Sequence, residues 1–481
     1  MILRLAVRSL LAHPIRSLVL SCGFGLGVGV MATLLGVGEV ILDQARSPAL
    51  SGGGDVVLTG ASGQIPAARW VLSSALQSGA LASRVAASSP SRRAPLYLIR
   101  NGRHVPIRAR GGIPSLERAL GDPETSAVTG WRDEPADRLW ASPDPAAALR
   151  ALDRFHPIPA LPSDTDGSRD DEMRSWAEWL YFNGGAGDNR FYLTFLAGPR
   201  ERDGTRAAGV RLQLDRAGVR SSYSMRANLD ESELLRTAPD LTIGANRVRL
   251  NGLRYEIALD LPREVTGGGG NTAREASRIR GNLVLEAVAG RAIPPLTLHG
   301  IGGWVSGYVV PVMSGPLRGT LVLGDQIIRV DGGTGYHDHN WGFWNGVSWR
   351  WGQVHHGDIS LVYGRINPPE HAADAERIPG FLAALGPGGL IGYATRVSIE
   401  ESDDPRTGQP ARIAITARGP SIDLTLDLAI EDVVVTRGGG LFAANLDFLQ
   451  LRARYQVRGT LDGRQLDFTA DGSAETFRDG P

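Results

Sequence analysis

The sequence predicts a mainly β protein with two consecutive antiparallel β-barrels, preceded by one transmembrane helix and a mixed α/β segment. Three observations predict this arrangement. Apolar and polar residues alternate with a period of two from about residue 156 onward, turn signals separate the alternating runs, and residues 17–38 carry no charged side chain. Because roughly 300 residues of short strands are too many for a single β-sandwich, we expect two barrels of about 150 residues each.

The uncharged run at 17–38 is long enough to cross a bilayer. Its 22 residues span about 33 Å as a helix, at roughly 1.5 Å per residue. A cleaved signal peptide is the alternative, but its apolar region is usually shorter and ends in small residues, whereas Glu39–Leu42 follows here. We therefore expect an anchor within residues 1–43. The flanking charges place the N-terminus in the cytoplasm and the remainder outside; they are Arg4, Arg8, Arg16, Glu39 and Asp43.

Residues 44–155 form the mixed segment, which is punctuated by serine, glycine and proline. Within it, Asp144 and Pro145 precede AAALRALDRF, and these two residue types are typical of the first positions of a helix. The pattern of the segment indicates no function.

The strands predicted after residue 156 bury every second side chain. The runs at 253–261, 422–430 and 449–457 each place apolar residues on one face and polar residues on the other. Gly324-Asp325 and Asp462-Gly463 are turn signals, and residues 267–271 and 370–380 are predicted surface loops. We place the junction between the barrels near residue 319, which gives domains of 156–318 and 319–481.

Composition excludes several classes of function. Lysine plus arginine and aspartate plus glutamate both number 51, so no broad basic field is present to hold nucleic acid. The single cysteine, Cys22, lies in the first apolar run. A disulfide framework and a cysteine-based zinc site are therefore excluded.

Histidine and tryptophan are concentrated in one string, GTGYHDHNWGFWNGVSWRWGQVHH, at residues 333–356. It holds four of the nine histidines and four of the ten tryptophans. In a strand, successive side chains point to opposite faces, so the string can serve a cavity and a seam between barrels at once. Alternation places Tyr336, Asp338 and Asn340 on one face, and His337, His339 and Trp341 on the other.

Two motifs together resemble a known family. SWAEWLYFNG at 175–184 and GTGYHDHNWG at 333–342, followed by WRWG at 349–352, resemble the AttH/carotenoid 1,2-hydratase (CrtC) family of lipocalin-like proteins. The resemblance covers about residues 156–481. It implies two consecutive lipocalin-like β-barrels with a ligand cavity and no cofactor. The family includes hydratases, pericyclases and proteins of no established activity encoded beside ABC-transporter components.

The hydratase branch implies acid catalysis on an apolar substrate. Protonating an unactivated C=C bond requires a carboxyl group that stays neutral in a dry pocket, and aromatic faces stabilise the resulting cation. Asp338 is the candidate acid, with His337 or His339 as orienting or water-activating base; Tyr336, Trp341 and Tyr363 are candidates to line the cation. The predicted ligand-binding residues are Glu178, Trp179, Tyr181, Asn340, Trp341, Trp344, Trp349, Trp351 and Tyr363.

Two alternatives remain open for the string. In the first, His337, His339, Asp338 and Asn340 form a hydrogen-bonded network that ties the barrels together, with the tryptophans in the core. In the second, His337 and His339 bind zinc or iron together with one of His355 and His356, and with Asp338 or Asp358 as the carboxylate. The resemblance implies no metal, and we predict none.

Residues outside the string have alternatives of their own. Glu178 either pairs with Arg190 or Arg211 or faces the cavity beside Asp338. His156 and His299 are predicted to be lone structural histidines.

The resulting expectation is a membrane-anchored protein that binds a hydrophobic molecule, such as a lipid or isoprenoid, in a barrel cavity. It is expected to be single-pass in the inner (cytoplasmic) membrane, with both barrels extracytoplasmic, in the periplasm. Residues 3–39 also resemble the first membrane helix of FtsX/MacB-type ABC permeases, which implies an ABC transporter as partner. The alternative function is a cofactor-free hydratase or isomerase with Asp338 as general acid.

Overall fold

The computed structural model describes residues 84–100, 103–122, 145–161, 168–264, 278–288, 291–386, 389–437 and 446–479, with short stretches and single residues between 12 and 72 and between 125 and 137. The chain divides into two compact units. One comprises residues 1–65 and 86–141, and the other comprises residues 66–85 and 142–481.

The first unit contains an antiparallel hairpin of β1 (Ser91–Arg100) and β2 (Arg103–Gly112), followed by the short helix α5 (Pro114–Ala119). Arg110 of β2 forms ion pairs with the buried carboxylates of Glu117 and Asp122 at 3.3 and 2.5 Å. Glu117 also accepts a hydrogen bond from Ser89 at 2.8 Å. These contacts hold the end of the hairpin against the helix.

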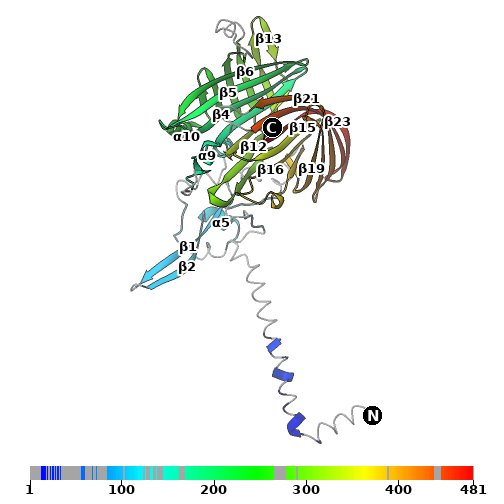
Figure 1. Ribbon diagram of the computed structural model, residues 1–481. Helices are drawn as coiled ribbons and strands as arrows, with labels where there is room; N and C mark the ends of the chain where they lie inside the picture. Colours follow the sequence, from blue (N-terminus) through cyan, green and yellow to red (C-terminus); the bar gives the residue numbers. More distant parts are fainter. Residues whose placement is uncertain are drawn as a thin grey trace. The chain divides into compact units, whose positions relative to one another are not determined.

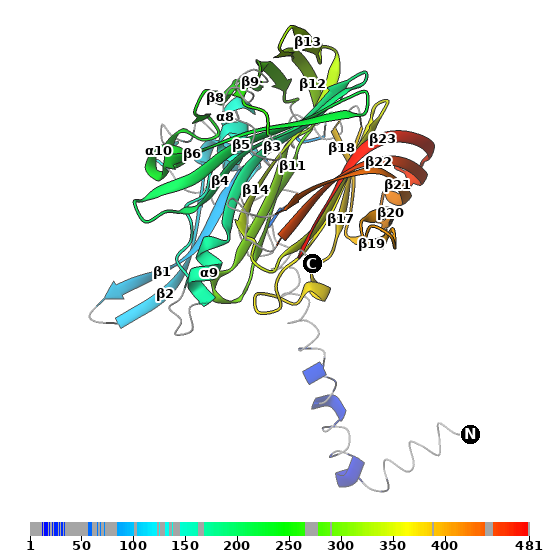
Figure 2. The same ribbon diagram turned by 45° about the horizontal axis from the view of Figure 1, so that its top comes forward.

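The second unit is built on two antiparallel sheets, coloured green to yellow-green and yellow to red in Figures 1 and 2. Within the described residues the first sheet follows the path β6-β5-β4-β3-β14-β12-β10-β9-β8-β7, and β11 and β13 also pair with β12. Its strands are β3 (Trp176–Ala186), β4 (Asn189–Arg200), β5 (Thr205–Arg216), β6 (Val219–Asp230), β7 (Leu241–Ile243), β8 (Asn246–Asn251), β9 (Arg254–Leu261), β10 (Ile279–Glu286), β11 (Ile293–His299), β12 (Val305–Leu323), β13 (Gln326–Arg329) and β14 (Gly333–Phe343).

The second sheet follows the path β18-β17-β16-β15-β23-β22-β21-β20-β19. Its strands are β15 (Ser348–His356), β16 (Ile359–Asn367), β17 (Phe381–Gly386), β18 (Gly389–Ala394), β19 (Arg396–Asp403), β20 (Pro410–Arg418), β21 (Ile422–Arg437), β22 (Leu446–Leu461) and β23 (Arg464–Asp479). The helices of this unit are α8 (Pro145–Leu152), α9 (Ser168–Arg174) and α10 (Glu231–Thr237), with 3-10 turns η2 (Ile301–Gly303) and η3 (Ala375–Arg377).

Each sheet curls back on itself, so both are nearly closed barrels. In the first sheet, an isolated bridge joins Tyr223 of β6 to Arg263, just after β9. In the second, Ser421 Oγ donates to the Ile391 carbonyl at 3.1 Å, which joins the start of β21 to β18. The fold is therefore mainly β, with two barrel-like antiparallel sheets, as the period-two pattern predicts.

The apolar core continues from the first sheet into the contact between the sheets. It contains residues of both, whereas a separate core fills the inside of the second sheet. Hydrogen bonds cross the seam; among them, Trp351 Nε1 donates to Tyr308 Oη at 2.9 Å, and Gln353 Nε2 donates to Asn183 Oδ1 at 2.9 Å. The two sheets thus share a buried face along β12, β14, β15 and β23.

The predicted turns form, but the junction between the sheets lies later than predicted. Gly324-Asp325 closes the β12–β13 hairpin, and Asp462 and Gly463, with φ of 49° and 76°, close β22–β23. Residue 319 lies inside β12, whose partners β13 and β14 keep the chain in the first sheet. The chain therefore enters the second sheet only between Phe343 and Ser348.

The two predicted loops differ in what the structure describes. Residues 370–380 connect β16 to β17 as a loop that includes η3. Residues 267–271 lie outside the described residues.

The predicted mixed segment at 44–155 is divided between the two units. Its last part, starting with α8, belongs to the second unit. Ala148, Leu149 and Leu152 of this helix are buried in the core of the first sheet. The helix predicted after Asp144 is present, and it serves as part of the barrel.

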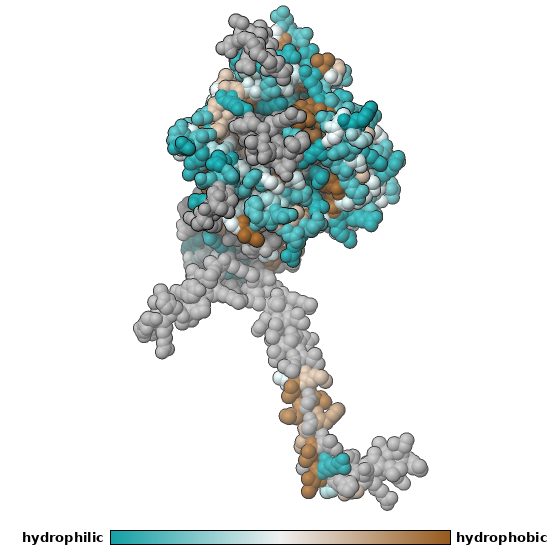
Figure 3. All heavy atoms as spheres, viewed as in Figure 1, coloured by the Kyte–Doolittle hydropathy of each residue, from teal (hydrophilic) through white to brown (hydrophobic). Residues whose placement is uncertain are grey.

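The predicted membrane span at 17–38 lies largely outside the described residues. Among the residues that the structure does describe, no helix combines the length and apolar character needed to cross a bilayer. The large apolar side chains described in this region are highly exposed, and they form the hydrophobic stretch near the N-terminus in Figure 3; they are Ile15, Val19, Phe24, Leu26, Val28, Val30 and Met31.

Candidate functional site

Strand β14, which carries the histidine and aromatic string, lies between β3 and β12 and is paired along both edges. Register with β3 sets Asp338 opposite Tyr181 and His339 opposite Leu180. Its side chains alternate between two environments, as predicted. The odd-numbered ones enter the interior of the first sheet, and the even-numbered ones face the seam with the second sheet.

On the interior face, two buried histidines bond to one buried carboxylate. His337 Nε2 and His339 Nδ1 lie 3.0 and 2.9 Å from the two oxygens of Asp153, and all three side chains are fully buried. His339 Nε2 lies 2.9 Å from Glu178 Oε1. Tyr255 Oη donates to Asp153 at 3.0 Å. The interior face therefore holds a hydrogen-bonded network within the first sheet.

The charges of this network are matched. Burial opposes charge on Asp153, but the positive charge of His337, with hydrogen bonds from both histidines, outweighs burial and lowers the pKa of Asp153. Burial likewise opposes charge on His339, yet hydrogen bonds to Asp153 and Glu178 raise its pKa to about 9. Burial opposes charge on Glu178 as well, but the neighbouring His156 and His339 lower its pKa. Paired in this way, the buried ions avoid the cost of isolated charges.

Two predictions are corrected by this network. Glu178 pairs with neither Arg190 nor Arg211 and does not face the cavity, because it points to the interior with the even-numbered side chains of β3. His156 is not a lone histidine, since its Nδ1 lies 2.8 Å from Glu178 Oε1 and its ring stacks on Trp341 with centroids 4.2 Å apart.

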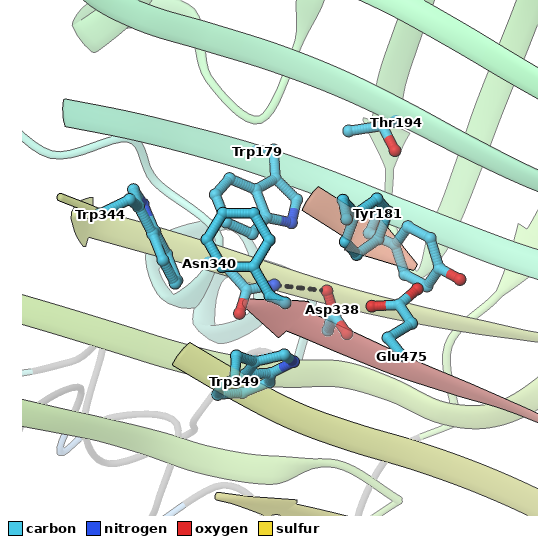
Figure 4. A pocket seen from close by; sticks show the side chains of 10 residues that line it. Trp179, Tyr181, Thr194, Asp338, Asn340, Trp344, Trp349 and Glu475 are labelled. Atoms are coloured by element: carbon cyan, nitrogen blue, oxygen red, sulfur yellow. Dashed lines mark hydrogen bonds between the residues drawn. The ribbon is translucent and has the colours of Figure 1, made fainter. Parts of the chain in front are cut away.

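On the seam face, aromatic side chains surround a small cavity of about 40 Å³ (Figure 4). It lies where β3, β4 and β14 of the first sheet meet β15, β22 and β23 of the second. Its lining combines five aromatic rings beside a tyrosine with two carboxyl groups and two polar side chains: Trp179, Tyr181, Thr194, Asp338, Asn340, Trp344, Trp349, Phe448, Glu475 and Phe477.

Hydrogen bonds fix the Asp338 carboxyl in the cavity wall. Tyr336 Oη donates to Oδ2 at 2.9 Å, and Asn340 Nδ2 donates to Oδ1 at 2.7 Å, the bond drawn in Figure 4. Tyr308 Oη lies 2.7 Å from Tyr336 Oη and accepts from Trp351 Nε1. Because Trp351 can only donate, the chain runs from Trp351 through Tyr308 and Tyr336 to Asp338.

Glu475 provides a second carboxyl in the same cavity. Figure 4 shows its carboxyl group between Asp338 and Tyr181, and its Oε1 has no hydrogen-bond partner among the described residues. Burial raises the pKa of Glu475 to about 7. Burial and the neighbouring Glu475 raise the pKa of Asp338 well above its usual range. At neutral pH the cavity therefore suppresses the charge of Asp338 and leaves Glu475 able to gain or lose a proton.

A larger polar cavity of about 490 Å³ lies along the same seam. It is lined by Tyr336 together with Asn183, Gln353, Ser473 and glycine-rich backbone of β3 and β14. Asn183 is buried, and its Nδ2 has no hydrogen-bond partner within the described part of the chain. Tyr336 thus lines the polar cavity and contacts Asp338 of the aromatic one.

The structure sorts the predicted site residues into four places. Trp179, Tyr181, Asp338, Asn340, Trp344 and Trp349 line the aromatic cavity. Tyr336 and Trp351 lie in the hydrogen-bond chain that leads to Asp338. His337, His339, Glu178 and Trp341 lie on the opposite face of their strands, in or against the interior network. Tyr363 packs inside the second sheet, because alternation in β16 points it away from the seam.

The network that was predicted to join the barrels is therefore divided in two. Asp338 and Asn340 belong to the seam, whereas His337 and His339 belong to the first sheet alone. The metal set left open as an alternative does not assemble either, since His355 Nδ1 bonds to Ser360 Oγ at 2.9 Å and His356 stacks on Phe468.

Sequence reasoning missed the residues that complete both clusters. Asp153 follows α8, and Glu475 lies in β23, 137 positions after Asp338 in the chain. In β23 the alternation of polar side chains is a weak signal that Glu475 faces a buried seam, and no sequence signal pairs it with Asp338.

Comparisons with known proteins give distant matches. No family model matches the sequence, and no curated protein matches it. An AttH structure from Nitrosomonas europaea is similar at 16% identity and a TM-score of 0.40, over 68% of this chain and 99% of that one. A structure of CghA is similar at 12% identity and 0.40, over 68% and 96%; CghA with Sch210972 gives 11% and 0.38 over the same shares.

Likeness at this level supports no conclusion about activity or ligand. The resemblance of the first helix to FtsX/MacB permeases finds no support in these comparisons.

Proposed function

We propose that the chain binds an apolar or amphipathic small molecule in the aromatic cavity between its two sheets. One observation carries the proposal: two carboxyl groups whose ionisation is opposed by burial lie among aromatic rings in a buried seam. Neutral carboxyl groups do not repel an apolar ligand as charged ones would, and they still offer hydrogen bonds that orient it.

The size of the cavity limits which part of a ligand it can hold. About 40 Å³ holds about three water molecules, so the cavity as it stands accepts one end of a ligand. Trp179 and Phe448 in its wall are half-buried, so a longer apolar body would extend from the cavity past these two rings. A polar group on the same ligand fits the larger cavity beyond Tyr336, which supports an amphipathic molecule.

The test is binding of N-phenyl-1-naphthylamine, a probe that fluoresces in apolar sites, followed by energy transfer from tryptophan. Thr194→Phe fills the cavity and is expected to weaken binding by at least about tenfold, or about 1.4 kcal/mol. Thr425→Phe, at an exposed position of β21, is the matched control and is expected to bind as the native chain does. Equal affinities in all three proteins would refute the site.

A second candidate function is acid catalysis on a C=C bond, which Glu475 favours. A carboxyl with a pKa of about 7 is suited to give and take a proton near neutral pH. The proton of Glu475 or Asp338 would add to one alkene carbon, and water would add to the other. The proton released by that water would return to the carboxylate, so no cofactor is consumed.

The catalytic alternative is tested with acyclic isoprenoid alkenes and mass spectrometry of the product, which gains one water. Asp338→Asn and Glu475→Gln are expected to abolish turnover while N-phenyl-1-naphthylamine still binds. Turnover that survives both substitutions would exclude these carboxyls as the acid, and an absence of turnover in the native chain would leave binding as the function.

The anchor and location are part of the same proposal and rest on the sequence. Residues 17–38 would hold the chain in the inner membrane, which gives the cavity access to lipid-soluble ligands. Resistance of the full chain to carbonate extraction, and protease access to the barrels from the periplasmic side, would support this. Repeated failure to co-purify a permease or ATPase subunit would count against an ABC transporter as partner.

A further inference from the structure

We propose that His156, Glu178 and His339 form a binding site for a divalent metal ion, and that Zn²⁺ is the ion this donor set fits. Two imidazoles and one carboxylate are a donor set that zinc sites use, and three protein ligands leave a further position for water. The site lies on the interior side of β3 and β14, away from the aromatic cavity.

The geometry brings the three donors to one point. His156 Nδ1 and His339 Nε2 lie 2.8 and 2.9 Å from the same oxygen of Glu178. One ligand atom from each of the three residues lies within 4.8 Å of the other two. The two imidazole centroids are 6.0 Å apart, so both rings can point a nitrogen at one ion between them. In the metal-free chain, protons shared with Glu178 occupy that space.

Hydrogen bonds from neighbouring groups orient the three ligands, as hydrogen bonds to the ligands do in metal sites. The other nitrogen of His339, Nδ1, is 2.9 Å from Asp153 Oδ1, which leaves Nε2 for the ion. Asp153 is itself held by Tyr255 and His337. The backbone N–H of His156 donates to both oxygens of Glu178 at 3.0 Å, which fixes the carboxylate.

Access and charge also fit an ion. The side chain of His156 is 38% exposed, whereas those of Glu178 and His339 are fully buried, so an ion enters beside His156. Zn²⁺ would replace the proton between His339 and Glu178, and two buried carboxylates, Glu178 and Asp153, would balance its charge. Trp341, stacked on His156, covers one side of the opening.

The experiment titrates the full chain, freed of metal by chelation, with Co²⁺ and follows visible absorption. One equivalent is expected to give the intense bands of a four-coordinate site, and Zn²⁺ is expected to displace them. His156→Ala is expected to weaken binding by more than about 100-fold. Removing a residue that only orients a metal ligand costs at most about 100-fold, so a larger loss identifies His156 as a ligand. His371→Ala, an exposed histidine elsewhere, is the control.

Two results would overturn the site: no binding of Co²⁺ or Zn²⁺ by the native chain at micromolar concentration, or unchanged binding in His156→Ala. Circular dichroism checks that the variants keep their β structure. Because the aromatic cavity lies on the other face of β14, His156→Ala is expected to bind N-phenyl-1-naphthylamine normally. Failure of the metal site and failure of the ligand cavity are therefore distinguishable.

Discussion

Glu475→Gln is expected to stabilise the protein at neutral and alkaline pH and to change little at acid pH. Glutamine keeps the shape of glutamate and removes the charge. Below pH 4.5 the carboxyl is protonated in both the folded and the unfolded chain, so it makes no difference there. As pH rises above 4.5, the unfolded chain loses this proton while the folded chain retains it, which destabilises the native protein.

The size of the effect follows from the folded pKa of Glu475, which burial raises from 4.5 to about 7. Each pH unit between these values is worth about 1.4 kcal/mol, so the native chain loses about 3 kcal/mol between pH 4 and pH 8. The variant avoids that loss. Without the Glu475 charge, Asp338 also ionises more easily, which adds to the gain in the same direction.

The assay is urea-induced unfolding of the full chain, followed by tryptophan fluorescence at pH 4 and pH 8. The free energy of unfolding of the variant minus that of the native chain is expected to rise by about 3 kcal/mol between the two pH values. Glu400→Gln, at an exposed position of β19, is the control and is expected to give no such rise. If the difference in the free energy of unfolding between Glu475→Gln and the native chain does not change with pH, the inference that burial raises the pKa of Glu475 is wrong.

Three further predictions concern the first sheet. Asp153→Asn leaves two buried histidines without their carboxylate and is expected to cost about 3–5 kcal/mol in urea unfolding; a loss below about 1 kcal/mol would contradict the ion pairs. In metal-free protein, His339, with its pKa raised from 6.5 to about 9, stabilises the fold below pH 6.5, and this stability is lost as pH rises through 9. His339→Gln is expected to remove that slope, and an unchanged slope would assign it to another group. Gly307→Ala places a Cβ against the Trp341 ring and is expected to cost about 1–3 kcal/mol, with altered tryptophan fluorescence; an unchanged midpoint would show that the ring can move.

The strands and the faces of β14 could be predicted because a strand has a fixed period. The apolar alternation in residues 422–430 and 449–457 is enough to place β21 and β22, since a shift of one residue would expose the whole apolar face. The same rule separates Asp338 from His337 and His339. Tyr363 shows its limit: alternation tells which side chains share a face, but not which face of β16 meets the seam.

The partners of the buried groups could not be predicted, because they depend on pairs of segments that only the folded chain brings together. Asp153 reaches His337 and His339 from the end of α8, and Glu475 reaches Asp338 from the last strand of the other sheet. The junction between the sheets was missed for a similar reason. Turn residues near 324 indicate a hairpin, but they do not tell whether the next strand returns to the same sheet.

The two faces of β14 depend on each other through register. A one-residue slip of this strand would bring His337 and His339 to the seam and carry Asp338 into the interior of the first sheet. The ion pairs of both histidines with Asp153 cannot form in the slipped register, because the odd-numbered side chains would then point the other way. Buried ion pairs add little net stability, yet they penalise every arrangement that leaves a charge unpaired. The interior network therefore fixes the register of β14, and this register keeps Asp338 in the cavity wall although no residue of the network lines the cavity.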